Sequence, residues 1–314
     1  MFTPSAPNPA LAIALILVAS MFIAATTLLA KALGTHSLGP PMHALQISHG
    51  RFLFAFVAFA GVAAVMRPDI RAPNLPLHAA RSAFGWMGIS LLFAAVAFIP
   101  LSDATAISFL NPVFAMMLAV PLLGEKVGRV RWSAAAIALA GALILLRPGP
   151  SSFQPAALLA LTAALLMGAE IICIKRLSRT EGPMQILLIN NAIGFSIASV
   201  AVLAVWSAPT PAQWAALAGI GLLMALAQTC FVNAMARADA SLVVPFSYAT
   251  LVFAALFDLT IFKVVPDGVS LIGAAIIIAG AALLAWREAW LGRRAAKARR
   301  DNATQRPCIR RQGD

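Results

Sequence analysis

Residues 100–112 read PLSDATAISFLNP, and residues 239–248 read DASLVVPFSY. Both stretches carry an Asp-Ala pair followed by a hydroxyl residue, and both carry a proline further on. They occupy similar places in the two halves of the chain. A second pair of similar stretches supports the relation, with AGAL at 140–143 and AGAA at 279–282. The sequence therefore indicates an internal repeat.

The composition is that of a membrane protein. Of the 314 residues, 61% are hydrophobic and 11% are charged, whereas soluble domains are about 45–50% apolar and about 25% charged. A chain this apolar has too little polar surface to cover itself in water. The three cysteines lie far apart and form no disulfide framework. These features exclude an ordinary soluble enzyme, a disordered protein and a secreted disulfide scaffold.

Apolar stretches of membrane-spanning length recur along the chain. A helix needs roughly 20 apolar residues to cross a bilayer, and backbone groups in lipid must be satisfied within the segment. The predicted spans are 10–31, 44–66, 81–100, 104–123, 131–147, 155–175, 184–206, 213–236, 242–262 and 268–287. The expected fold is an all-α integral membrane protein with ten transmembrane helices.

The positions of the basic residues predict the orientation of these helices. With the amino terminus in the cytoplasm, 19 of the 23 lysines and arginines lie on the cytoplasmic side, three lie outside and Arg51 lies within a helix. This bias follows the positive-inside rule. We therefore predict a multi-pass protein of the bacterial inner membrane with both termini cytoplasmic. The same topology explains the net charge of +12 without a nucleic-acid partner.

Each predicted repeat contains five helices. Because five is odd, the second repeat enters the membrane from the opposite face, which makes the two repeats inverted. Inverted repeats place a substrate site near the midplane, between halves that can rock. The predicted organisation is a cytoplasmic segment at 1–9, repeats at 10–147 and 154–287, and a basic, disordered cytoplasmic tail at 288–314.

Three short segments also carry a family resemblance. Residues 100–112, the LLGEK of 122–126, and residues 240–248, together with the five-plus-five arrangement, resemble the EamA family of the drug/metabolite transporter superfamily over about 10–287. In the second repeat, Val264 stands where the family often has a glutamate.

The resemblance implies a secondary carrier with a central cavity that works by alternating access, either coupled to protons or running downhill, with no ATP site. The family includes exporters of amino acids and related metabolites, and importers of compounds such as S-adenosylmethionine and riboflavin. The implied partners are the lipid bilayer and a small-molecule substrate, either amino-acid-like or nucleoside- or cofactor-like. A monomer and a homodimer both remain open.

Arg51 is the first candidate for a substrate-binding residue. It lies about eight residues inside the second apolar stretch, where a charge costs roughly 2.5–3.5 kcal/mol on insertion scales. It could receive a carboxylate or phosphate of the substrate, or it could form a structural salt bridge. Gln46 is expected near the outer mouth of the cavity. His49 could be a proton site or a neutral packing residue.

Two acids in apolar runs are candidates for proton coupling. Glu170 lies near the inner end of its helix and Asp258 near the outer end of its helix. Burial raises the pKa of a carboxyl group, which suits a proton site. Alternatively, each acid could pair with the base nearest in sequence, Lys175 for Glu170 and Lys263 for Asp258.

Helix breaks and scattered polar residues complete the candidate cavity. Pro112 and Pro245 remove a backbone donor and free a carbonyl one turn earlier, as in the broken helices that hold substrate in carriers. Either proline could instead be a packing kink. The remaining candidate lining residues are Asn111, Tyr248, Asn190 and Trp86.

Catalytic motifs are missing from the sequence. There is no glycine-rich Gly-Lys-Ser/Thr loop, no HExxH and no serine elbow. We therefore predict no enzyme activity, no cofactor and no metal site. A membrane-embedded enzyme or a non-transporting membrane scaffold is the alternative reading.

Overall fold

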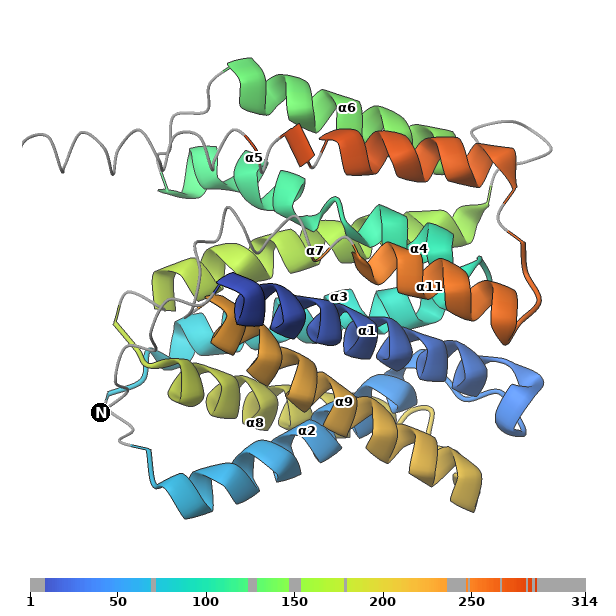
Figure 1. Ribbon diagram of the computed structural model, residues 1–314. Helices are drawn as coiled ribbons and strands as arrows, with labels where there is room; N and C mark the ends of the chain where they lie inside the picture. The colour runs from blue at the N-terminus through green and yellow to red at the C-terminus, as the bar shows by residue number, and fades with distance from the viewer. Residues whose placement is uncertain are drawn as a thin grey trace, which may run out of the picture.

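The computed structural model describes residues 9–68, 72–123, 129–146, 154–177, 180–235, 247, 249–265, 267–280, 282–283 and 286. Within these ranges every regular element is a helix (Figure 1). The labelled helices are α1 (Pro9–Gly34), η1 (His36–Leu38), α2 (Ala44–Met66), α3 (Leu75–Val96), α4 (Leu101–Ser108), α5 (Asn111–Leu123), α6 (Arg129–Leu146), α7 (Pro155–Leu177), α8 (Pro183–Val202), α9 (Pro211–Met235) and α11 (Ala249–Thr260).

The helices confirm the predicted class of fold. Among the described residues, seven helical segments are long and apolar enough to cross a membrane, and two shorter apolar helices cover Ala249–Thr260 and Gly268–Gly280. One of the seven, Leu101–Leu122, combines α4 and α5. The seven long segments, the two shorter helices and α6 together correspond to the ten predicted spans. The chain is a multi-pass membrane protein.

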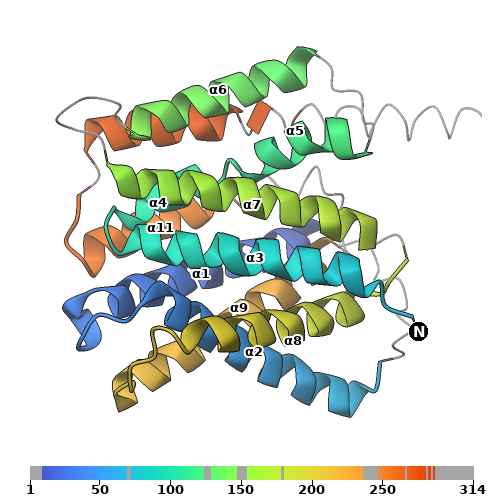
Figure 2. The same ribbon diagram turned by 180° about the vertical axis from the view of Figure 1, so that it is seen from behind.

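Contacts between the two halves follow the symmetry of an inverted repeat. If α1, α2, α3 and α5 correspond to α7, α8, α9 and α11, each contact between the halves should occur twice. The contact of α3 with α7 is matched by that of α9 with α1, that of α2 with α9 by that of α8 with α3, and that of α5 with α7 by that of α11 with α1. The α2–α8 contact maps onto itself. Figures 1 and 2 show the resulting interleaved bundle.

The third helix begins earlier than predicted. The sequence predicts a start at residue 81, but α3 starts at Leu75. Asn74 caps it by accepting a hydrogen bond from the Leu77 amide at 3.2 Å. Pro76 reads as a breaker in sequence but is tolerated in the first turn, where its missing N–H has no partner to lose. Arg81 therefore lies inside the helix and is buried, rather than in a loop.

The fourth span is interrupted between Ser108 and Asn111. Pro112 is the second residue of α5, so its ring would clash with the carbonyl four residues earlier, that of Ser108. α4 ends at that residue. The interruption brings Ser108, Phe109 and Asn111 to the wall of a central cavity.

Candidate substrate-binding cavity

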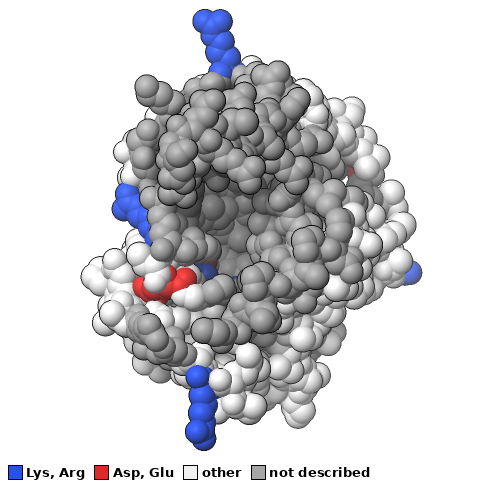
Figure 3. All heavy atoms as spheres, turned by 60° about the vertical axis from the view of Figure 1, so that its left-hand side comes forward, with Lys and Arg blue, Asp and Glu red and all other residues white. Residues whose placement is uncertain are grey.

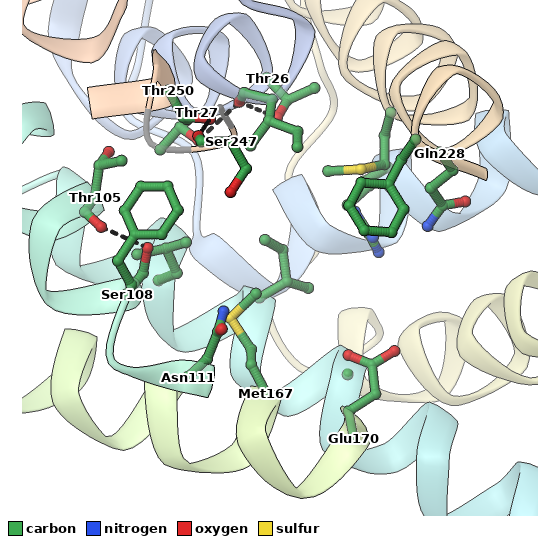
Figure 4. Close-up of a pocket in the computed structure, with 18 of the residues that line it drawn as sticks. Thr26, Thr27, Thr105, Ser108, Asn111, Met167, Glu170, Gln228, Ser247 and Thr250 are labelled. Atoms are coloured by element: carbon green, nitrogen blue, oxygen red, sulfur yellow. Dashed lines mark hydrogen bonds between the residues drawn. The ribbon is translucent and has the colours of Figure 1, made fainter. Parts of the chain in front are cut away.

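A cavity of about 280 Å³ lies between the two halves of the bundle. Described residues of α1, α2, α3, α4, α5, α7, α8, α9 and α11 contribute to its wall. Figure 4 shows hydroxyl residues on one side and Glu170 and Gln228 on the other. Phe52, Phe109 and Phe231 are aromatic parts of the wall. The cavity combines apolar surface with a few polar groups, as small-molecule sites do.

Arg51 supplies the cavity with hydrogen-bond donors. The residue is 8% exposed and lines the cavity from α2. Its Nε and Nη1 atoms are buried without a hydrogen-bond partner among the described residues. The guanidinium carbon lies 4.4 Å from the centre of the Phe52 ring. A buried donor without a partner is costly, so the guanidinium group is suited to a ligand that brings an acceptor.

Glu170 faces the same cavity and lies near two arginines. Its Oε1 is 3.6 Å from Nε of Arg81, and it also interacts electrostatically with Arg51. Nη1 of Arg81 donates to the Ile186 carbonyl at 2.9 Å. Among the described residues, the ion-pair partner of Glu170 is therefore Arg81 on α3. The side chain of the sequence neighbour Lys175 lies outside the described residues.

The carboxyl group of Glu170 packs against the backbone of α3 at Gly85. A Cβ atom added at Gly85 would lie 2.9 Å from both carboxyl oxygens of Glu170. No real side chain accepts a contact that short without movement. The glycine therefore allows the acid of α7 to approach α3 closely, next to Arg81.

The two candidate asparagines also contribute to the cavity wall. Asn111 begins α5 at the interruption, and Asn190 comes from α8. Oδ1 of Asn190 accepts a hydrogen bond from the Ser82 hydroxyl at 3.1 Å. This bond fixes the amide of Asn190 against α3.

Three other candidates lie outside the walls of the described cavities. Gln46 is 1% exposed, and its amide joins α2 to the loop before α9 by donating to the Ser207 carbonyl at 2.6 Å. The His49 ring lies between Phe195 and Trp206, with ring centres 5.5 and 6.3 Å away. Trp86 packs against the hydrophobic core. All three make packing or hydrogen-bond contacts in this structure, and their role in substrate binding stays a prediction.

Asp258 forms a buried ion pair instead of lining the cavity. Its Oδ1 is 2.7 Å from Nζ of Lys31, and its Oδ2 accepts the Ser102 amide at 2.8 Å. The pair joins α11 to the end of α1 and the start of α4. The partner suggested by sequence proximity, Lys263, is not the base found here. The two other candidates from this region, Tyr248 and Pro245, lie outside the described residues.

A second chamber of about 430 Å³ adjoins the cavity and shares Ile23, Glu170, Met224, Gln228 and Phe231 with it. It extends to Arg81 and Glu181 at the end of the bundle where α2 ends and α8 begins. Figure 3 looks onto this end, where the molecule is hollowed and acidic side chains lie at the edge of the hollow.

Glu181 ties the two halves together beside this chamber. Its carboxylate accepts hydrogen bonds from the Asn74 amide at 2.9 Å and from Gln185 at 2.6 Å, and it lies 2.7 Å from Nε2 of His78. Burial acts to raise the pKa of this carboxyl group, but the hydrogen bonds from Asn74, His78 and Gln185 outweigh it and hold the pKa below its ordinary value.

Sequence reasoning missed several residues of the site. Arg81 was assigned to a loop because Pro76 obscures the start of its helix. The cavity threonines Thr26, Thr27, Thr105 and Thr250 gave no signal, because threonine is unremarkable in an apolar helix. Within the described ranges, no cluster of three or more histidines, cysteines, aspartates or glutamates could hold a metal ion.

Comparison with known proteins finds transporters. The model of the EamA-like transporter family matches residues 10–147 and 154–286. A riboflavin transporter of Vibrio cholerae is 32% identical over 253 residues, which cover 76% of this chain and 84% of the relative. An S-adenosylmethionine uptake transporter of Rickettsia bellii is 26% identical over 80% of this chain and 87% of its own length.

A solved structure supports the fold. One solved crystal structure superposes on this chain with a TM-score of 0.61 at 19% sequence identity. The superposition covers 88% of this chain and 98% of the other. At that identity the likeness concerns the fold alone. The family model matches both halves, and residues of both halves line the cavity. The chain therefore belongs to the EamA-like transporter family and is a secondary transporter of a small metabolite.

Proposed function

We propose that the chain carries riboflavin, or a metabolite of similar shape and polarity, across the bacterial inner membrane by alternating access. The observation that carries this proposal is a cavity lined by both halves, with Arg51 in its wall. The Nε and Nη1 donors of Arg51 have no hydrogen-bond partner among the described residues. A ligand acceptor beside this guanidinium would satisfy a buried donor that has no partner among the described residues.

The charges of the site are compatible with a neutral substrate. Arg51 and Arg81 face one acid, Glu170, which interacts with both. The single positive charge left over suits an anion, as the sequence suggested, but it equally suits the carbonyl oxygens of a flavin ring. The relative named a riboflavin transporter favours the neutral ligand. The aromatic and methionine side chains of the wall fit a flat ring.

The orientation of the carrier follows from its charges. We infer that both termini lie in the cytoplasm, because 19 of the 23 basic residues are then on that side. The second chamber, beside Glu181, then opens toward the cytoplasm. In this proposal the protein is a carrier and not an enzyme.

Riboflavin measured inside and outside cells tests the proposal. Three strains of riboflavin-producing cells are compared: one with an empty vector, one with the unaltered chain and one with Arg51→Gln. The two proteins are present at equal membrane abundance. We expect the unaltered chain to shift the ratio of inside to outside riboflavin, upward for uptake or downward for export, and Arg51→Gln to abolish the shift. A ratio equal to that of the empty vector overturns the riboflavin assignment.

A further inference from the structure

We infer that the cavity is polarised in its hydrogen bonding, so that the substrate binds in one orientation. The donor groups of the substrate lie against α1, α4 and α11, and the carbonyl acceptor of the substrate lies against Arg51. This inference rests on the proposed function, because it concerns how the substrate lies in the same cavity. It also defines the class of substrate: a molecule with hydroxyl or N–H donors at one end and a carbonyl acceptor at the other.

The wall formed by α1, α4 and α11 offers acceptors. Six hydroxyl residues line the cavity there, and one of them is Ser247, just before α11. The hydroxyls of the other five, Thr26, Thr27, Thr105, Ser108 and Thr250, are each bonded to a backbone carbonyl of their own segment, at distances of 2.7, 3.1, 2.6, 2.7 and 2.8 Å in that order.

A carbonyl oxygen can only accept a hydrogen bond, so each of these hydroxyls must be the donor. A hydroxyl has one proton and two lone pairs. With the proton committed to the backbone, the lone pairs are what each oxygen can still offer to a ligand. Figure 4 shows the labelled hydroxyl residues grouped on one side of the cavity. Thr26, Thr27, Thr105, Ser108 and Thr250, together called here the hydroxyl wall, can therefore accept hydrogen bonds from a substrate. They cannot donate one to it without breaking a hydrogen bond to the backbone.

Arg51 has the opposite character. A guanidinium group carries only donors, and two of the nitrogens of Arg51 lack partners among the described residues. It belongs to α2, a helix that contributes no residue to the hydroxyl wall, and it packs against Phe52. Glu170, which could have neutralised the arginine fully, is shared with Arg81. A substrate acceptor is thus the group that completes this part of the cavity.

The remaining wall fits the body that must join these two ends. Phe52, Phe109, Phe231, Met167 and Met224 all line the cavity, and aromatic rings and thioethers pack well against flat heteroaromatic groups. A ring bearing carbonyl groups with a hydroxyl-rich chain attached has this arrangement of donors, apolar surface and acceptors. A ring without the chain would keep only the contacts to Arg51 and the apolar wall.

Two flavins test the hydroxyl wall and Arg51 separately. The full chain, purified in detergent, is titrated with riboflavin and with lumiflavin, which has the same ring but no hydroxyl chain, and the change in flavin fluorescence is followed. We expect Thr26→Val and Thr105→Val each to weaken riboflavin binding about three- to tenfold, the range that one hydrogen bond supports, and to leave lumiflavin binding unchanged. Arg51→Gln should weaken both flavins about tenfold or more.

Thr229→Val is the matched control. Thr229 makes the same kind of bond to its own helix, with its hydroxyl 2.8 Å from the Ala225 carbonyl, but it is exposed and does not line the cavity. It should change neither affinity, and a monodisperse gel-filtration peak should accompany every variant.

Each alternative outcome has a distinct meaning. If riboflavin binds the unaltered protein but the threonine variants lose nothing, or lose riboflavin and lumiflavin equally, the polarised orientation is wrong while the proposed function stands. If Thr229→Val weakens binding as much as Thr26→Val, the effect belongs to the helices and the inference also fails. If neither flavin binds the unaltered protein, the proposed substrate is wrong and the inference falls with it.

Discussion

At the scale of single residues, the buried charges of the described chain differ in how many of their polar atoms have partners. A charge within the bilayer is expensive and usually marks a function. Lys31 and Asp258 satisfy each other at 2.7 Å, and Arg81 is bonded to a carbonyl and lies beside Glu170. Two nitrogens of Arg51 have no such bond among the described residues. This contrast is the reason for proposing that Arg51, rather than Lys31 or Arg81, serves the substrate.

The ion pair of Lys31 and Asp258 gives the first prediction. Asp258→Asn leaves a buried lysine without its counter-ion, and breaking a buried pair in this way costs about 3–5 kcal/mol. The free energy of unfolding should therefore fall by about that amount. The double variant Lys31→Met with Asp258→Asn should recover most of the loss, because no uncompensated charge remains. A single variant as stable as the unaltered protein in denaturant titrations would contradict the assignment.

Glu181 gives a prediction about pH. Its pKa is held below the ordinary carboxyl value of 4.5, so its contribution to stability is fully present above that value. The contribution is lost as the pH falls through the lower pKa of the folded state. Glu181→Gln should therefore unfold at a lower temperature than the unaltered protein at neutral pH, and the gap should shrink as the pH falls below about 4.5. A gap that stays constant with pH would exclude this role for the carboxylate.

The sequence indicated several residues of the cavity wall, but it did not indicate their partners. Arg51, Glu170, Asn111 and Asn190 stand out as polar residues in apolar runs, and all four line the cavity. The partners could not be found in the same way. Asp258 pairs with a base 227 residues away, although Lys263 is much nearer in sequence. Nearness along a helix says nothing about which other helix will pack there.

At the scale of secondary-structure elements, close approach of helices depends on glycine. Without a strong hydrophobic drive between helices in lipid, packing relies on small residues. On α9, a Cβ added at Gly221 would meet the side chain of Phe54 and would lie 2.9 Å from the Ala55 amide nitrogen. The neighbour there is backbone, which cannot rotate away. The α2–α9 contact therefore requires glycine at this position.

Gly221→Ala should thus be destabilising, by about 1–3 kcal/mol as for other overpacked sites. Gly61→Ala is the matched control, because a Cβ at Gly61 of α2 meets no atom within 4 Å. That change should alter stability by less than about 1 kcal/mol. Thermal unfolding of both variants in the same detergent checks the pair. Equal stabilities would show that α2 and α9 do not pack as described.

The boundaries of elements were predicted less well than their existence. Pro76 was treated as a loop residue, and the true start of α3 depends on the cap that Asn74 provides. A sequence pattern cannot distinguish a proline before a helix from one in its first turn. By contrast, the interruption before Asn111 coincides with Pro112, because the effect of a proline inside a helix is local.

At the scale of the whole molecule, the two halves are tied at both ends around the cavity. At the end where α1 finishes, Lys31 contacts Asp258, Gln46 bonds Ser207 and Gln213 donates to the Pro40 carbonyl at 2.8 Å. At the other end, Glu181 joins the loop before α8 to the start of α3. The second chamber reaches that other end. Alternating access would require the first set of ties to open when the chamber closes.

The hydropathy of the chain and its internal repeat predicted this architecture, because both are properties of the whole chain. The shape of the cavity was beyond the sequence, since it arises where nine of the described helices meet.

Counterflow in proteoliposomes tests the central claim, that this cavity carries substrate between the two sides of the membrane, most directly. Vesicles loaded with unlabelled riboflavin are diluted into a trace of labelled riboflavin, with the unaltered chain, with Arg51→Gln or with no protein. A carrier should concentrate the label transiently inside the vesicles, whichever direction it runs in the cell, and Arg51→Gln should lose this accumulation. If the label only equilibrates in vesicles with the unaltered chain, as it does without protein, riboflavin is not the cargo of this cavity. If Arg51→Gln accumulates label at the full rate, Arg51 does not serve the substrate.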